Sequence, residues 1–457
     1  MMDLLKALII AGAYGIVGPV LGWWLARHRQ AERACFCLML FMTGWAPSKL
    51  TLMLGSIEFY RGHTKGFEFS LIEVVAVALI VCAASRRPPG FRWMPPGSWL
   101  WLSFCLLSLG SFGVALNKLY VLMAFWKFAK IILVFMAAYH GLRDLEDLRW
   151  LLRAIAAMLL VQVFVALKLR YFDGRWQVHG WFEHQNPMAM WAYLAALPLL
   201  AGALAPQTKT RETKFYLAGF MAAGLLILLS VSRGALAAFS IGSVLVLGLA
   251  ALRGFSGRLL GVAAGSVVCA ALAALLALDS FAARVKEASS RVEEQDLRAV
   301  MIVQSKAMLH DSWVGIGWNN FGVANSRPLG KYSEIVEDWD KSRGFTIYDE
   351  NYYANALTES LYWLLLGENG YPGFSGFVLF LLLTYWWCLR ATGRYWRSLT
   401  GWVAGGLLVA LTLIYIHGTV ERVLTQTKNL SEWLIFAGCL ARLTWCRRHG
   451  LDLTEPE

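Results

Sequence analysis

Long apolar runs alternate with short polar connections over most of this chain. A run of about twenty apolar residues crosses roughly 30 Å of hydrocarbon as a helix, and counting such runs predicts about thirteen helices, or between about twelve and fourteen. The runs are continuously apolar and lack the period-two alternation of barrel strands, so strands are not expected. The pattern therefore predicts an all-α, polytopic transmembrane helical bundle. The predicted segments are 4–25, 35–54, 70–85, 99–113, 119–140, 150–169, 187–205, 215–232, 235–252, 259–278, 372–391, 401–418 and 431–446.

One long polar stretch, from about Asp279 to Asn355, interrupts this pattern. Water must solvate its amide and charged groups, so we expect one large loop outside the bilayer. Within it, 283–309 has helical spacing, and 354–366 predicts a helix too short to span. The loop is therefore partly helical. The expected divisions of a single integrated domain are a transmembrane block at 1–278, a periplasmic loop with short helices at 279–371, and C-terminal transmembrane helices with a cytoplasmic tail at 372–457.

Composition supports a membrane protein over a soluble one. Of 457 residues, 58% are apolar and 16% are charged, whereas soluble domains have roughly 45–50% and about 25%. The net charge of +12 is spread over many connections and forms no single basic face, so a nucleic-acid partner is not expected. The eight cysteines lie in or beside apolar segments, which argues against a disulfide framework or a thiolate metal site.

The cations predict the sidedness of the bundle. Alternate connections are rich in Arg and Lys, and the positive-inside rule assigns these to the cytoplasm. The long polar stretch then lies outside, together with 170–186, 232–234, 419–430 and the N-terminus. The cations of the cytoplasmic set are Arg27, Arg29, Arg33, Arg86, Arg87, Arg92, Arg143, Arg149, Lys209, Arg211, Lys214, Arg253, Arg258, Arg390, Arg394, Arg397, Arg447 and Arg448.

Three outward-facing patches hold the residue types that carry chemistry. Arg233 sits on a short external turn, where a guanidinium either extends to lipid headgroups or grips a phosphate in a bidentate way. Arg298 is either a solvated helix charge or a second phosphate ligand. Most Trp and Tyr residues are typical of an interfacial belt, and the rest are candidates to stack on sugars. The pair His179 and His184 lacks further ligands, so no metal site is expected. The candidates for substrate binding are Arg175, His179, Trp181, His184, Asn186, Trp318, Asn320 and Tyr362.

The order of these motifs resembles the O-antigen ligase/polymerase superfamily of bacterial membrane glycosyltransferases. The resemblance covers roughly 176–373, with apolar helices on both sides. The motifs are Gly180-x-Phe182-x-His184-Gln185-Asn186-Pro187, then Ser232-Arg233-Gly234-Ala235-Leu236, then Arg298 with Gly315-Ile316-Gly317-Trp318-Asn319-Asn320-Phe321, then Glu359-x-x-Tyr362-Trp363, and finally Glu368-x-Gly370-x-x-Gly373.

This resemblance implies a multi-pass enzyme of the bacterial inner membrane with its site at the periplasmic face. It would pass a glycan from an undecaprenyl-diphosphate carrier to a hydroxyl on lipid A core or a growing polysaccharide, without cofactor or metal. Arg233 and Arg298 match the family arginines that hold the diphosphate. Where ligases of the family have a His-Asn pair, this chain has Glu359-Ser360. Either Glu359 acts as the base, or the chain is a polymerase-like or divergent member.

Other interpretations stay open at this level. Asp349 and Glu350 are alternative bases, and Glu368, beside glycine in a turn, is expected to be a structural acceptor. A transporter or flippase for a lipid-linked glycan or small solute would explain ionisable residues inside apolar segments. Those residues are Lys49, Glu73, Lys127 and Lys130. A non-catalytic scaffold for polysaccharide assembly is a third possibility.

Overall fold

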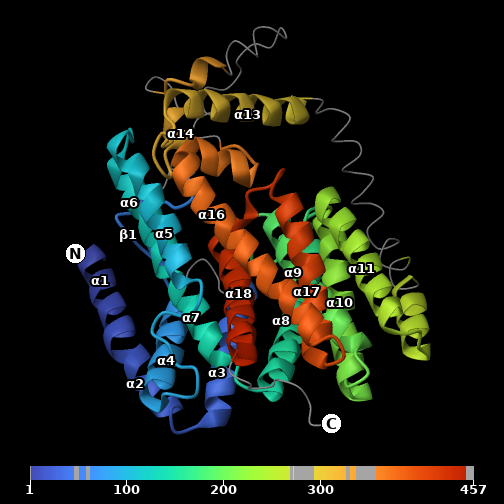
Figure 1. Ribbon diagram of the computed structural model, residues 1–457. Coiled ribbons are helices and arrows are strands. Elements are labelled where there is room, and N and C mark those ends of the chain that lie inside the picture. Colours follow the sequence, from blue (N-terminus) through green and yellow to red (C-terminus); the bar gives the residue numbers. More distant parts are fainter. Residues whose placement is uncertain are drawn as a thin grey trace.

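Helices make up nearly all of the described structure (Figure 1). The computed structural model describes residues 2–45, 51–57, 62–267, 271, 293–325, 330–335 and 357–448. Its elements are α1 (Met2–Gly12), η1 (Ala13–Val17), α2 (Gly18–Leu25), α3 (Arg29–Trp45), β1 (Thr51–Leu54), β2 (Phe67–Ser70), α4 (Leu71–Arg86), α5 (Ser98–Ser108), η3 (Leu109–Gly113), α6 (Lys118–Lys130), α7 (Ile132–Gly141), α8 (Leu145–Tyr171), α9 (Gln185–Leu204), α10 (Thr210–Ser230), α11 (Arg233–Arg253), α13 (Glu293–Asp311), α14 (Phe321–Ala324), α16 (Leu361–Arg394), α17 (Leu399–His417), η4 (Val423–Thr425) and α18 (Thr427–Arg448).

The all-α class is confirmed, and several helices have the length that a bilayer requires. Within the described ranges, eight helices are long and apolar enough to cross a membrane, and Ser98–Gly113 is a shorter apolar helix. This is consistent with a multi-pass membrane protein. The eight are Asp3–Leu25, Lys118–Gly141, Leu145–Tyr171, Gln185–Leu204, Thr210–Ser230, Arg233–Arg253, Leu361–Arg394 and Leu399–His417.

The helix predicted at 35–54 is wrong in its last part, and so is the expectation of no strands. The helix α3 ends at Trp45, and β1 pairs antiparallel with β2, with Thr51 opposite Ser70 and Leu54 opposite Phe67. A short apolar run has no period of its own, so sequence alone does not separate a helix end from a strand. Residues 46–50 lie outside the described part of the chain, as do most of the last helical turns predicted at 259–278 and the start of the helix predicted at 283–309.

The helices predicted at 354–366 and 372–391 lie in one kinked element, α16, which begins at Leu361; residues 357–360 are not helical, and 354–356 lie outside the described residues. Its helical geometry is interrupted at Gly370, whose φ of 59° and ψ of −167° are not helical. Pro372 follows two residues later, near the start of the second half, where a missing N–H costs little. The kink lets one chain segment both span the bundle and turn across its end.

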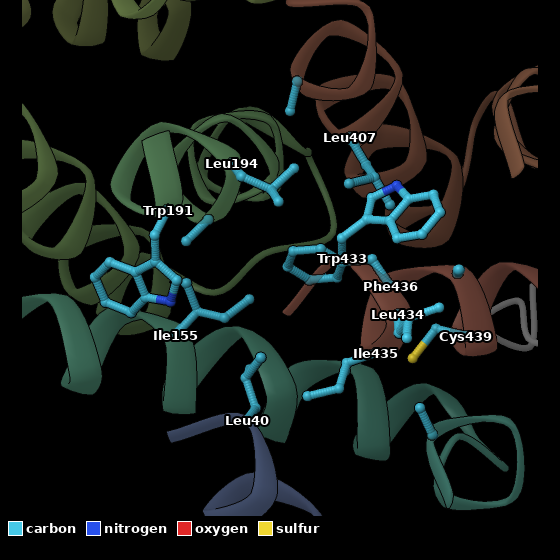
Figure 2. Packing of buried hydrophobic residues seen from close by; sticks show 14 of the residues in the cluster. Leu40, Ile155, Trp191, Leu194, Leu407, Trp433, Leu434, Ile435, Phe436 and Cys439 are labelled. Carbon is cyan, nitrogen blue, oxygen red and sulfur yellow. The ribbon is translucent and has the colours of Figure 1, made fainter. Parts of the chain in front are cut away.

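The helix α9 forms the centre of the bundle. Every residue from Pro187 to Leu204 is buried, between α8, α10, α11 and α17. Figure 2 shows Trp191 and Leu194 of α9 lying near Ile155 of α8, with residues of α17 and α18 on the other side. The Trp191 ring keeps its polar atom satisfied, because Nε1 donates to Thr43 Oγ1 at 3.1 Å. The first turn of α9 is thereby fixed at the end of the molecule that carries the polar loop.

The cation-rich connections meet at one end of the bundle, here called the cation-rich end. There Arg29 and Arg33 both bind Asp147, with Nη2–Oδ2 and Nε–Oδ1 distances of 2.5 and 2.8 Å. Arg86 binds Glu32 beside them at 2.5 Å. These contacts join three connections that are far apart in sequence, so the grouping predicted from the charge pattern is present in space.

The described parts of the long polar stretch, 293–325 and 330–335, lie at the opposite end, here called the polar-loop end. The helix α13 runs across the ends of the bundle helices there (Figure 1). Backbone bonds join the surrounding connections, from Val178 N to Leu229 O at 3.3 Å and from Leu361 N to Gly418 O at 2.9 Å. The first candidate span reaches the cation-rich end at Leu25, so its start lies toward the polar-loop end.

The shared carboxylate of Asp147 gives a test of how the cation-rich end is held. Its side chain is only 1% exposed, and Asp147→Ala removes one carboxylate partner from each of two guanidinium groups. Removing one side of a fully buried ion pair costs about 3–5 kcal/mol, and the cost is smaller here because both arginines keep their pairing with Asp144. We expect a clearly lower melting temperature in detergent, measured by tryptophan fluorescence. The control is Asp173→Ala, at an exposed residue. Equal melting temperatures for the two variants would contradict the role given to Asp147.

Candidate functional site

A backbone clasp holds the kink of α16 against the turn that follows α13. Ile316 N donates to Gly367 O at 3.0 Å, and Gly317 N donates to Glu368 O at 3.1 Å. Tyr371 N donates back to the turn at 3.0 Å. We call residues 313–321 together with 367–371 the clasp. It fixes α13 relative to α16, and so it sets where the side chains of α13 lie over the bundle.

The carboxylate of Glu368 is the anchor of the clasp. Its two oxygens accept from Asn319 N and Phe321 N, each at 3.0 Å, and Oε2 also lies 2.6 Å from His63 Nε2. The side chains of Glu368 and His63 are both 0% exposed. These hydrogen bonds of the Glu368 carboxylate are all made to protein groups. This is the structural role expected from its place beside glycine in a turn.

Two sequence candidates belong to the interior of the clasp. The Trp318 ring is fully buried, with centroids 4.8 and 5.3 Å from those of Phe128 and Phe104. Asn320 is also buried, and its Oδ1 accepts from Asn117 N at 2.7 Å. We assign both residues to the packing that supports the site and not to contact with a substrate.

Next to the clasp, two carboxylates converge on one guanidinium. Arg298 of α13 forms an ion pair with Glu359, which precedes α16, and its Nη2 lies 3.6 Å from Glu421 Oε1. Asn186, in the first turn of α9, donates from Nδ2 to the same Glu421 oxygen at 2.7 Å. Arg298 and Glu359 are 46% and 42% exposed, whereas Glu421 is 14% exposed. Four segments distant in sequence therefore meet here.

The environment of Glu421 raises the pKa of its carboxyl. Burial and the neighbouring Glu359 carboxylate raise its pKa to about 7, against the opposing effects of the nearby arginines and Asn186. The next residue, Arg422, has its pKa lowered by burial, although the acidic residues around it act in the other direction. Arg422 makes no ion pair with any residue that the structure describes, so its guanidinium remains available to an anion.

Arg233 lies at the same end, at the start of α11. It is exposed and makes no ion pair with the described residues. The position of α11 is fixed by a close approach, because a Cβ on Gly234 would lie 2.8 Å from His417 Nε2. His417 ends α17, stacks on the ring of Tyr193, and accepts through its backbone oxygen from Glu421 N at 2.9 Å. Arg233 thus sits beside the segment that carries Glu421 and Arg422.

The outward-facing segment 174–187 lies along this site, and its residues have hydrogen-bond partners of their own. Arg175 Nη1 lies 2.9 Å from His179 Nε2. His184 is the N-cap of α9, and its Nδ1 accepts from Asn186 N at 3.4 Å. The backbone oxygen of Trp181 accepts from Lys428 Nζ at 2.5 Å. From this segment, Asn186 binds Glu421 of the carboxylate pair.

Tyr362 supports the site from α16. Its hydroxyl donates to Tyr415 O at 2.7 Å, and the neighbouring Leu361 N donates to Gly418 O. These bonds hold the start of α16, and Glu359 just before it, against the end of α17. The sequence candidates Asp349 and Glu350 lie outside the described residues.

Sequence reasoning assigned the segment 419–430 to this face but named none of its residues. Glu421 and Arg422 are the two that the structure adds, with His417 just before them. A signal was present in the chain, because the run His417–Arg422 is polar and separates two apolar segments. Its partners Asn186, Arg298 and Glu359 come from three other regions, so spacing along the chain does not reveal the contact.

The described residues contain no group of three or more His, Cys, Asp and Glu side chains placed to hold a metal ion. No family model matches the chain, and no curated protein matches it. The assignment of function therefore rests on the chemistry of the site itself.

The clasp predicts that Gly370 tolerates no side chain. A Cβ there would lie 2.2 Å from Trp313 O, and its φ and ψ fall in a region used almost only by glycine, where other residues cost about 1–3 kcal/mol. We expect Gly370→Ala to lower both the melting temperature and the yield of monodisperse protein. Gly393→Ala in the same helix is the control, since nothing lies within 4 Å of its Cβ. Similar behaviour of the two variants would contradict the clasp.

Proposed function

We propose that this chain is a membrane glycosyltransferase that moves a glycan from a polyprenyl-diphosphate carrier to an acceptor hydroxyl. The observation that carries the proposal is the cluster of Arg298, Glu359 and Glu421, with Arg233 and Arg422 beside it. This cluster brings together arginines that can bind phosphate and a carboxylate, Glu421, whose pKa is about 7. The ordered motifs shared with the O-antigen ligase/polymerase superfamily support the same reaction.

The arginines suit the departing diphosphate. Guanidinium groups bind phosphate oxygens in a bidentate way and remain charged at any physiological pH. Arg233 and Arg422 have no carboxylate partner among the described residues, and Arg298 has two. Fixed cations of this kind stabilise the negative charge that grows on the leaving group, usually the largest contribution to such a reaction.

Glu421 is better suited than Glu359 to act as the base. Glu359 is committed to the ion pair with Arg298, whereas Glu421 has a pKa of about 7 and keeps a longer distance of 3.6 Å from the same guanidinium. A base works best when its pKa lies near the operating pH. We therefore assign proton removal to Glu421. Glu359 has two other roles: it positions Arg298, and its negative charge helps to raise the pKa of Glu421.

The proposed step conserves atoms and charge. The acceptor oxygen gives its proton to Glu421 and forms a bond to the anomeric carbon of the donor sugar. The bond from that carbon to the phosphate oxygen breaks, and its electron pair leaves with the polyprenyl diphosphate. Asn186 holds the Glu421 carboxylate in place through its 2.7 Å hydrogen bond. The acceptor is lipid A core or a growing polysaccharide.

The expected location follows from the arrangement of charge. If the cation-rich end takes the cytoplasmic side, by the positive-inside rule, the polar-loop end faces the periplasm of a bacterial inner membrane. Lipid-linked glycans carry their diphosphate at the membrane surface. A site at the ends of the candidate spans is at the depth where that diphosphate would lie.

The transporter interpretation receives less support from the buried charges that suggested it. Lys127 Nζ lies 3.7 Å from Glu68 Oε1, and Lys130 forms an ion pair with Glu73. These charges neutralise one another in fixed pairs, and Lys49 lies outside the described residues. Movement of a lipid-linked glycan across sealed liposomes, without glycan transfer, would favour a transporter instead.

Loss of an arginine is expected to slow transfer without unfolding the protein. Arg298→Ala removes a donor to the leaving group, and such losses typically reduce the rate about 10²–10³-fold. Arg422→Gln is expected to act in the same direction. The measurement is transfer in detergent from undecaprenyl-diphosphate oligosaccharide, alongside the melting temperature of each variant. The control is Arg170→Ala, in the last turn of α8 at the same end. Full activity in the first two variants would refute the roles assigned.

The pKa of Glu421 predicts how transfer depends on pH. A raised pKa means that the base is protonated below about 7, so kcat/KM should rise as pH increases through that value. Glu421→Gln should abolish this rise together with most of the activity. Glu359→Gln removes a negative neighbour that raises this pKa, so the midpoint of the residual activity should move to lower pH. An unchanged profile in Glu421→Gln would exclude it as the base.

A further inference from the structure

A second charged concavity lies at the cation-rich end, far from the carboxylate pair. It has a volume of about 820 Å³ and is lined by the starts of α8 and α10. Ligand sites commonly have volumes of roughly 300–1,000 Å³, so the hollow has the size of a binding site. We call it the basic hollow. Nothing in the proposed transfer reaction uses it.

The carboxylates of the basic hollow are already paired. Arg153 binds Glu212 at 2.6 Å and Glu146 at 3.1 Å, and Arg149 lies 3.6 Å from Glu146. These four residues account for both acids and for two of the five cations in the lining. The hollow therefore keeps an excess of positive charge.

The excess cations are Lys209, Arg211 and Lys214. All three are exposed, and none forms an ion pair with a residue that the structure describes. They also lie in the first turns of α10, where the helix dipole already places partial positive charge. Lys209 is the N-cap residue and offers no side-chain acceptor to the free backbone N–H groups. The N–H groups and dipole of a helix N-terminus favour an anion, and the three cations add to that preference, because Glu212 in the same turn is already paired with Arg153.

The lining of the basic hollow changes from charged to apolar residues along α10. Phe215 and Ala218 follow the cations along α10, and both belong to its lining. Since α8 and α10 are both long and apolar enough to span a bilayer, the cations lie where headgroups would be and Phe215 lies toward the hydrocarbon. A polar anion with an attached apolar chain matches this order, whereas a free anion would use only the outer part.

We propose that the basic hollow binds the phosphate of an anionic phospholipid headgroup in the leaflet at the cation-rich end. Three unpaired cations and the N–H groups of the first turn of α10 hold the phosphate oxygens, and the apolar part of the lining receives the glycerol end of the acyl chains. Basic pockets between membrane helices are the kind of site that recognises cardiolipin and related headgroups. The proposal is independent of the transferase assignment.

The test compares lipids and charge-matched variants. Purified protein in detergent is titrated with cardiolipin, with phosphatidylcholine of the same acyl chains, or with sodium phosphate, and bound lipid is counted by native mass spectrometry alongside the melting temperature. We expect cardiolipin to bind and raise the melting temperature of the wild type, phosphatidylcholine to have little effect, and sodium phosphate to have little effect at equal concentration.

Three substitutions in the hollow, Lys209→Gln, Arg211→Gln and Lys214→Gln, should together weaken cardiolipin binding roughly 100-fold, since each nearby cation contributes about a factor of ten or less. The control removes the same charge from exposed cations at the same end but outside the hollow, with Arg390→Gln, Arg394→Gln and Arg397→Gln. The single Arg211→Gln variant tests the site should the triple variant unfold. Equal loss in both triple variants, or no loss in either, would overturn the site, and stabilisation by sodium phosphate as strong as that by cardiolipin would overturn the lipid.

Discussion

The Glu368 carboxylate fixes the position of α13, which lies across the end of the bundle, relative to α16. Two backbone N–H groups of the turn after α13 and the ring of His63 converge on its oxygens. These bonds add to the backbone hydrogen bonds of the clasp and to the small apolar cluster around Met308, Phe321 and Leu364, which also join α13 to α16. A buried carboxylate with donors on all sides is costly to disturb, since each lost partner leaves charge unsatisfied in a medium of low polarity.

Because Glu368 anchors α13, it also determines which charged side chains meet at the end of the bundle. It brings Arg298 over the end of the bundle, where Glu359 and Glu421 compete for one guanidinium. Burial of Glu421, together with the nearby Glu359 carboxylate, raises the pKa of Glu421 to about 7 although Arg298 acts in the opposite direction. At the same end, Arg233 and Arg422 make no ion pair of 4 Å or less with the residues that the structure describes, although several carboxylates act on Arg422 from farther away. The site therefore combines a carboxylate of raised pKa with nearby arginines, and this combination depends on segments that are far apart in sequence.

Sequence predicts the helical class, the location of most helices and the separation of cation-rich from polar-loop connections, because each depends on local hydropathy and charge. Prediction from sequence fails where contacts between segments distant in the chain determine the local structure. The strand at Thr51–Leu54 exists through its pairing with 67–70, and α16 is one kinked helix because the clasp holds Gly370. The same limit applies to the site. Arg298, Glu359 and Asn186 stand out by residue type, but Glu421 gains its character only from neighbours brought by α9 and α13.

The complete enclosure of α9 bears on how the chain is made. Its neighbours α8 and α10 leave the ribosome with it, whereas α17 and α18 are synthesised last. Until they arrive, the face of α9 that later packs against α17 and α18 is exposed to lipid or the insertion machinery, and Asn186 has no Glu421 to hold. A nascent or prematurely terminated chain thus lacks Glu421 altogether. On the proposed function, activity would arise only at the end of biogenesis, and an incomplete chain would not act on a lipid carrier.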